Sequence, residues 1–184
     1  RRNSMGSEVL ALSGDNAYLI GDGYTEDGQF PFLDQLNLKD TKAKRIYQSK
    51  YVDKVEDLRS YDLEKNELLV RVESSTEYPN YFFRDVKRSK LNQITFFENP
   101  FVSIQNVHKE VIDYKREDGL ALSGTLYLPI GYDARTKEKI PMIMWAYPAE
   151  FKDKASAGQS TQNPNEFTYP YYGSMIYWVT RGYV

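Results

Sequence analysis

Residues 140–151 read I-P-M-I-M-W-A-Y-P-A-E-F, and they decide how the rest of the chain is interpreted. Four apolar residues, 142–145, follow a proline and lead into a turn that carries Tyr147 and Pro148. A short apolar run of this kind is typical of a strand buried on both faces of a parallel sheet. Ligands bind outside the carboxyl ends of such strands, so the turn is a candidate functional position. The alternative is a core strand that ends in an ordinary proline turn.

Two segments in the first hundred residues match each other. Residues 37–42 (N-L-K-D-T-K) parallel residues 85–90 (D-V-K-R-S-K) at an offset of 48, and residues 15–20 parallel residues 65–70 at an offset of 50. A period of this length, made of short strands, is typical of β-propeller blades. The alternative is a pair of unrelated hairpins that share a generic turn.

Each of the two repeat units divides into four strand-like pieces separated by polar turn residues. We expect strands at 8–13, 16–21, 31–38 and 43–48, and then at 56–62, 67–73, 80–86 and 91–97. The acidic residues near G-D-G and E-D-G at 21–28 lack the alternate spacing of a calcium loop. We therefore predict a hairpin connection there and no metal.

The second half of the chain has a different pattern. Residues 110–116 and 120–128 alternate around an E-D-G turn, which predicts an antiparallel hairpin. A polar loop leads to the apolar strand at 140. Residues 171–179 have helical spacing, with Met175, Trp178 and Val179 toward one side, and Gly182 is a helix stop before a new strand at 183–184. This order predicts the opening of a mixed α/β sheet.

Composition excludes several classes of function. The chain has no cysteine, which excludes disulfides, thiol nucleophiles and cysteine-based zinc sites. The net charge is −2, with 15 basic and 17 acidic residues before His108 and nine of each after it. Neither half has the basic excess of a protein that binds nucleic acid or an anionic membrane, so we predict neither partner. No apolar run approaches the roughly 18 residues of a membrane span. Periplasm and cytoplasm both stay compatible.

The order of these segments resembles a known family. Repeats of about 48 residues lead into E-V-I-D-Y-K-R-E-D-G-L-A-L-S-G-T-L-Y-L-P, then into residues 140–151, and then into W-V-T-R-G-Y-V. This order resembles the prolyl oligopeptidase family of serine peptidases, and residues 145–159 resemble its glutamyl-endopeptidase-like branch. The resemblance implies two C-terminal β-propeller blades at 1–107 and the N-terminal portion of an α/β-hydrolase domain at 108–184. It also implies that the chain is a fragment.

The resemblance implies one catalytic residue in this chain. Tyr147 matches the tyrosine that stabilises the oxyanion, and the loop after that strand supplies part of the oxyanion hole in α/β-hydrolases. Pro148 and Ala149 stand where several relatives have two glycines, so the backbone geometry of the relatives' oxyanion hole does not carry over to this chain. The triad serine, aspartate and histidine are expected after Val184, because no serine present has glycine at both −2 and +2. His108, the single histidine, is expected to face solvent rather than to act in catalysis.

Three functions follow as hypotheses. The parent is a serine peptidase that hydrolyses short peptides through an acyl-enzyme, without a cofactor, and the fragment itself is inactive. The alternatives are an α/β-hydrolase esterase and a non-catalytic propeller interaction module. Open strand edges and uncovered apolar faces further predict that the fragment self-associates or swaps elements between copies.

Overall fold

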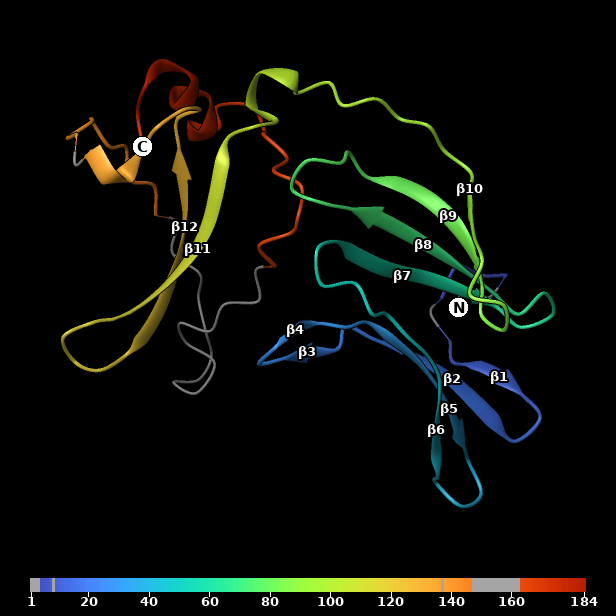
Figure 1. Cartoon of the computed structure of the whole chain (residues 1–184). Coiled ribbons are helices and arrows are strands. Elements are labelled where there is room, and N and C mark those ends of the chain that lie inside the picture. The colour runs from blue at the N-terminus through green and yellow to red at the C-terminus, as the bar shows by residue number, and fades with distance from the viewer. Residues whose placement is uncertain (1–3, 8, 137, 147–162) are drawn as a thin grey trace. The chain divides into compact units, whose positions relative to one another are not determined.

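The structure is a computed structural model that describes residues 4–7, 9–136, 138–146 and 163–184. Within these residues the chain is mainly β, with antiparallel sheets of four, four, two and two strands and three 3₁₀ helices (Figure 1). It divides into two compact units, Arg1–Glu98 and Asn99–Val184. In the described part of the chain, no helix is long and apolar enough to cross a membrane.

Two four-stranded antiparallel meanders make up the first unit (Figure 1). The predicted strand positions are confirmed, although the first and last strands are shorter than expected. Among the described residues the two meanders do not close into a ring. Their identity as propeller blades therefore stays a prediction. The strands are β1 (Ala11–Ser13), β2 (Asn16–Gly21), β5 (Phe32–Asn37) and β6 (Ala43–Gln48) in the first sheet, and β7 (Val55–Asp62), β8 (Glu67–Glu73), β9 (Asn80–Asp85) and β10 (Leu91–Gln93) in the second.

The internal repeat is confirmed by hydrogen bonds at matching positions. The side-chain Oδ1 of Asn37, and that of Asp85, accepts from the amide two residues further on at 2.9 Å. The amide of each residue donates to the carbonyl five residues on, at 3.0 and 2.9 Å. Asn16 pairs with Asn37 and Glu67 pairs with Asp85, so the upstream strands are offset by 51 residues. The expected offset of 50 is wrong, and a slip of one residue would exchange the faces of a strand.

The connection between β2 and β5 contains the short hairpin of β3 (Tyr24–Thr25) and β4 (Gly28–Gln29), as predicted. Gly23 closes this hairpin, since its carbonyl accepts from the Phe30 amide at 2.9 Å. Gly23 has a φ of +66°, and a Cβ at this position would lie 1.9 Å from the Phe30 carbonyl oxygen. Only glycine fits both the backbone conformation and the space.

The two sheets pack face to face through aliphatic side chains. Leu33 of the first sheet lies in one buried cluster with four residues of the second sheet, Leu58, Leu68, Val70 and Val72. At the edge of this cluster the rings of Tyr18 and Tyr61 are 5.4 Å apart. Each fully buried aliphatic side chain contributes roughly 1.5–3 kcal/mol, so this contact is the main apolar stabilisation of the unit.

A buried charge lies beside this apolar cluster. The Glu56 side chain is fully buried, and its two oxygens accept from the Arg84 Nε at 2.6 Å and from the Tyr47 hydroxyl at 2.5 Å. Burial alone would lower the pKa of Arg84, but the carboxylate of Glu56 raises it. Tyr47 belongs to β6 and Glu56 to β7, so the carboxylate joins the two sheets. Removing one partner of a buried pair costs about 3–5 kcal/mol.

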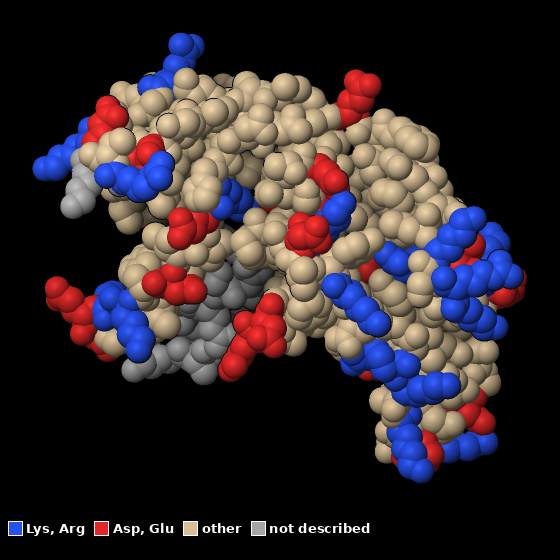
Figure 2. Space-filling view, viewed as in Figure 1, with Lys and Arg blue, Asp and Glu red and all other residues tan. Residues whose placement is uncertain are grey.

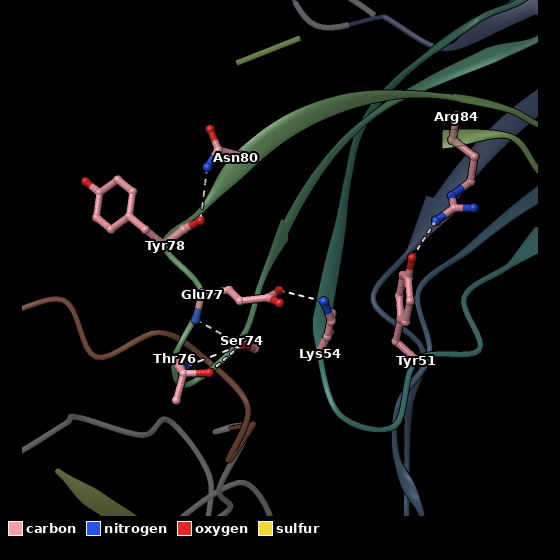
Figure 3. A network of polar contacts seen from close by, with 8 residues as sticks. All are labelled: Tyr51, Lys54, Ser74, Thr76, Glu77, Tyr78, Asn80 and Arg84. Carbon is pink, nitrogen blue, oxygen red and sulfur yellow. Dashed lines mark hydrogen bonds and ion pairs between the residues drawn. The ribbon is translucent and has the colours of Figure 1, made fainter. Parts of the chain in front are cut away.

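Arg84 also reaches the loop between the two sheets. Its Nη2 donates to the Tyr51 hydroxyl at 3.3 Å, and Figure 3 shows the two side chains pointing toward each other. Further along this loop the Lys54 Nζ pairs with the Glu77 carboxylate at 2.6 Å. The turn between β8 and β9 is closed by the Ser74 Oγ, which accepts from the Glu77 amide at 3.0 Å (Figure 3). The loop is thus tied to both ends of the second sheet.

The second unit is built on the predicted hairpin, β11 (His108–Lys115) with β12 (Ala121–Leu128). In its turn the Arg116 guanidinium, at 2.5 Å, lowers the pKa of Asp118 to about 2. Three 3₁₀ helices accompany the hairpin: η1 (Val102–Ile104), η2 (Ala134–Thr136) and η3 (Met175–Arg181). Ile104 of η1 packs with Ile176 and Val179 of η3 in a small core.

We expect Gly23→Ala to lower the free energy of unfolding by more than Gly14→Ala does. Gly14 has a φ of +56° and open space around it, so alanine there adds only the conformational strain of about 1–3 kcal/mol. Alanine at 23 adds a clash with the Phe30 carbonyl to the same strain. Urea denaturation followed by far-UV circular dichroism measures both variants. If both variants lost the same free energy of unfolding, the clash at position 23 would contribute nothing to stability.

Because the pKa of Tyr47 is raised in the folded state, we expect the protein to lose stability at high pH. Burial, and then the hydrogen bond to Glu56, raise the pKa of Tyr47 above its usual value of 10. Its contribution is therefore complete below pH 10 and is lost as the pH rises from there through the folded-state pKa. Tyr47→Phe should cost about 1.5–3 kcal/mol at pH 7, because a hydrogen bond to a charged group is lost. The difference between wild type and variant should narrow above pH 10 in urea denaturation, and a constant difference would contradict the assignment.

Candidate active site

Residues 140–146, proposed as a strand from the sequence, form no strand of a sheet in the structure, but they make two backbone hydrogen bonds with Val184. The Ile143 amide donates to the Val184 carbonyl at 2.7 Å, and the Val184 amide donates to the Pro141 carbonyl at 2.9 Å. Val184 thus bonds to Pro141 and Ile143, the two neighbours of Met142, and this is the hydrogen-bond pattern of two residues paired in parallel strands. These two bonds make a single parallel bridge between Met142 and Val184, while every sheet among the described residues is antiparallel.

The expected burial of this segment is wrong in the structure. Met142, Met144 and Trp145 are 66%, 77% and 59% exposed. Val184 pairs with one edge of the segment, and among the described residues no strand of any sheet pairs with the other. A central parallel strand is buried by neighbours on both edges and both faces, and this segment lacks most of them.

The segment that returns to Val184 passes through η3, which replaces the predicted helix at 171–179. In a 3₁₀ helix residues i and i+3 are aligned, so Ile176 and Val179 share the buried side. Trp178 lies outside this core and packs edge-on against Tyr183, with ring centroids 5.3 Å apart. Gly182 ends η3 with a φ of +85°, as predicted, and its amide donates to the last carbonyls of the helix.

Residues 163–169, which follow residues 147–162 in sequence, are anchored on the β11–β12 hairpin. Asn163 is buried, and its Oδ1 accepts from the Asn165 amide at 3.0 Å. The Lys109 Nζ donates to the Glu166 carbonyl at 2.9 Å. Phe167 is also buried and lies in an aromatic group with Phe101. Sequence reasoning missed this anchor, although N-P-N at 163–165 is a turn signal.

A tyrosine hydroxyl lies close to this anchor. Burial raises the pKa of Tyr127, and the charge of Glu166 raises it further, while a hydrogen bond with Thr168 lowers it. Tyr127 packs on the η1–η3 core from β12. The neutral phenol is therefore favoured, which suits a residue that packs on the core.

Of the two residues discussed from the sequence, the structure describes His108 and not Tyr147. Tyr147 lies outside the described residues, one position beyond Ala146 at the carboxyl end of the extended segment. His108 opens β11 with an exposed side chain, and its Nε2 is 3.6 Å from the Glu110 carboxylate. This exposure agrees with the expectation that His108 faces solvent.

The described residues around the 140–146 segment offer few side chains that could take part in catalysis or bind a metal ion. Among them no cluster of three His, Cys, Asp or Glu side chains could hold a metal ion. The loop that would contain the site joins Ala146 to Asn163, and both of its ends are fixed, one by the parallel pair and the other by the Asn163 turn. Residues 147–162, which include Tyr147, lie between these two ends and outside the described residues.

Comparison with known proteins adds a relation at the sequence level. No protein-family model matches the chain. Two plant proteins are similar to it, and both are named "Probable glutamyl endopeptidase, chloroplastic". The protein of Oryza sativa subsp. japonica is 38% identical over 197 residues, and that of Arabidopsis thaliana is 37% identical over 196. The matches cover 100% and 98% of this chain but 21% and 20% of the relatives, so the chain spans about a fifth of their length. The resemblance seen in the sequence agrees with these names at the level of a peptidase-related family.

Two solved structures of the AtxE2 isopeptidase are also similar. One is a variant with Astexin3-dC4 bound, with a TM-score of 0.44, and the other is the apo form, with a TM-score of 0.42. Both are 15% identical to this chain; they match 73% and 70% of it, and 20% and 18% of their own length. At this level of similarity they add nothing to the assignment of fold or function.

Ile176→Ala is expected to destabilise the second unit selectively. The core of Ile104, Ile176 and Val179 is small, so the loss should fall near the lower end of the usual 2–5 kcal/mol. Trp145 and Trp178, the two tryptophans of the chain, lie in this unit, so their fluorescence reports its unfolding.

The matched control is Tyr172→Ala, because the Tyr172 side chain is fully exposed and should contribute little. If the unfolding transition of Ile176→Ala coincided with that of Tyr172→Ala, η3 would not stabilise the unit.

Proposed function

We propose that the intact protein is a serine-type peptidase that hydrolyses short peptides, and that this chain contains the last propeller blades and the start of the α/β-hydrolase domain. One observation carries the proposal. The parallel pair of 141–143 with Val184 supports an α/β sheet that begins directly before the loop with Tyr147. The similarity of the whole chain to two proteins named endopeptidases supports the reaction class.

In the proposed mechanism Tyr147 acts on the oxyanion. A serine attacks the scissile carbonyl, a histidine takes the serine proton, and the tetrahedral intermediate carries a negative oxygen. The Tyr147 hydroxyl donates a hydrogen bond to this oxygen. A preorganised donor of this type contributes about 2.7–4 kcal/mol to the transition state. The serine and histidine are supplied outside this chain, so the chain by itself is inactive.

The two meanders have a separate role in this proposal. Stacked four-stranded sheets with a 48-residue period are the repeating units of a propeller. A propeller placed over a peptidase site admits short, flexible peptides and excludes folded proteins. The first unit therefore selects substrates by size, and the second unit contributes to the chemistry.

The esterase alternative shares the sheet and the oxyanion loop. The four-stranded repeat disfavours it, and so do the names of the two plant relatives. Their names also select the first substrates to test, which are peptides with a glutamyl residue at the scissile bond, compared with glutaminyl peptides and a simple ester. A purely structural module would hydrolyse none of the three.

Tyr147→Phe in the intact protein should lower kcat by about 10²–10³ with little change in KM, because the donor acts mainly in the transition state. Tyr172→Phe is the matched control, since its ring is fully exposed in this structure. Thermal unfolding of the variant should equal that of the wild type. An unchanged kcat in a folded variant would remove Tyr147 from the mechanism. A serine-directed fluorophosphonate should label the intact protein and fail to label this chain, and labelling of the chain would contradict its inactivity.

A further inference from the structure

The segment that leaves the second sheet after β10 is bound by the side chain of Asn80, the first residue of β9. The Asn80 Oδ1 accepts from the Phe97 amide at 2.7 Å and from the Thr95 hydroxyl at 2.9 Å. Its Nδ2 donates to the Phe97 carbonyl at 3.2 Å and to the Tyr78 carbonyl at 3.3 Å, and Figure 3 shows the bond to Tyr78. Phe97 is thus bound through both its amide and its carbonyl.

Thr95 and the backbone of Tyr81 complete this attachment. The regular pairing of β9 with β10 ends before Ile94, whose amide still donates to the Tyr81 carbonyl at 2.9 Å. The Tyr81 amide donates to the Thr95 hydroxyl at 2.8 Å, and the same hydroxyl donates to the Asn80 Oδ1. Side-chain hydrogen bonds thus extend the attachment beyond the last paired residue of β10.

Hydrogen bonds, rather than packing or charge, hold this segment on the sheet. Phe96 and Phe97 are 76% and 54% exposed, so neither ring is buried in the structure. Glu98 is the only charged residue of the sequence between positions 94 and 107, and Figure 2 shows few charged side chains where the chain runs from β10 to η1. Removing the hydrogen bonds of Asn80 should therefore release the end of the segment.

On the other side of Glu98 the chain is fixed again at once. The Asn99 Oδ1 accepts from the Phe101 amide at 2.8 Å. Phe101 packs on the core of the second unit, and its ring centroid lies 5.4 Å from that of Tyr169. Pro100 has a fixed φ and keeps the residue before it extended. Glu98 is thus the single residue between the two attachments, and the boundary between the two compact units falls directly after it.

We propose that the Asn80 side chain is a latch that confines the pivot between the two units to Glu98. With the latch closed, the free connection consists of one residue. With the latch open, residues 96–98 are free, because Thr95 keeps its hydrogen bond with the Tyr81 amide. At about 3.3–3.6 Å per extended residue, the reach of the free connection then grows roughly threefold. The latch therefore sets how freely the units turn, and this role does not depend on the proposed catalytic function.

Amide hydrogen exchange measured by NMR tests the latch itself. Asn80→Ala should raise the exchange rate of the Phe97 amide several-fold, because this amide loses its acceptor. The Asp85 amide, at the other end of β9, donates to the Lys90 carbonyl at 2.9 Å and should keep its protection. Asn80→Asp keeps the Oδ1 acceptor and loses the Nδ2 donor, so the Phe97 amide should stay protected in this variant.

Distances between two spin labels test the pivot, and the absence of cysteine from the sequence makes the labelling specific. Lys44→Cys in the first unit and Tyr172→Cys in the second each carry one label, since both side chains are exposed. Asn80→Ala should broaden the distribution of label distances, as should the insertion of two glycines after Glu98. Asn92→Ala is the matched control, because Asn92 is an exposed asparagine of the neighbouring β10.

Circular dichroism and urea denaturation establish whether the first unit is folded in each variant. Two results would overturn the proposal: an unchanged exchange rate of the Phe97 amide in folded Asn80→Ala, or label distances no broader in that variant than in Asn92→Ala. If Asn80→Ala does not fold, the two-glycine insertion after Glu98 decides. An insertion that leaves the distance distribution unchanged would show that the units do not pivot at Glu98.

Discussion

The arrangement of the first unit depends on a carboxylate that has no contact with water. Glu56 is held by a guanidinium from its own sheet and by a phenol from the other, at 2.6 and 2.5 Å. An ion buried without partners is unstable by several kcal/mol, so the two sheets cannot slide or separate without exposing this cost. The apolar cluster of Leu33 and Leu68 supplies attraction but accepts many orientations. Directional bonds to Glu56 select one of them.

The sequence predicted the eight strands of the first unit, because their alternation and polar turns are local properties of the chain. It also predicted the hairpin at 24–29 and the C-terminal stop at Gly182. The offset of the upstream repeat was wrong by one residue. Letter similarity cannot resolve such a difference, whereas the pairing of Asn16 with Asn37 and of Glu67 with Asp85 fixes it.

Other features depend on contacts between distant residues and could not be predicted from local patterns. The exposure of Met142 and Trp145 reflects which neighbours surround the segment, and an apolar run carries no record of them. The 3₁₀ form of η3 places Ile176 and Val179 together, while α-helical spacing suggested Met175 and Trp178 as well. Tyr147 stays a prediction, because it lies outside the described residues and its role rests on family resemblance.

The order of strands in the two meanders also bears on how quickly the chain folds. Each strand of a meander pairs with the next strand of its own sheet along the chain, and the longest connection is the one from Gly21 to Phe32, which contains the β3–β4 hairpin. The pair of Met142 with Val184 closes a loop of about forty residues, and each doubling of loop length adds about 0.6 kcal/mol of entropy cost. Contacts between near neighbours form faster than distant ones. During synthesis the two sheets of the first unit would therefore form before residues 141–143 acquire their partner at Val184.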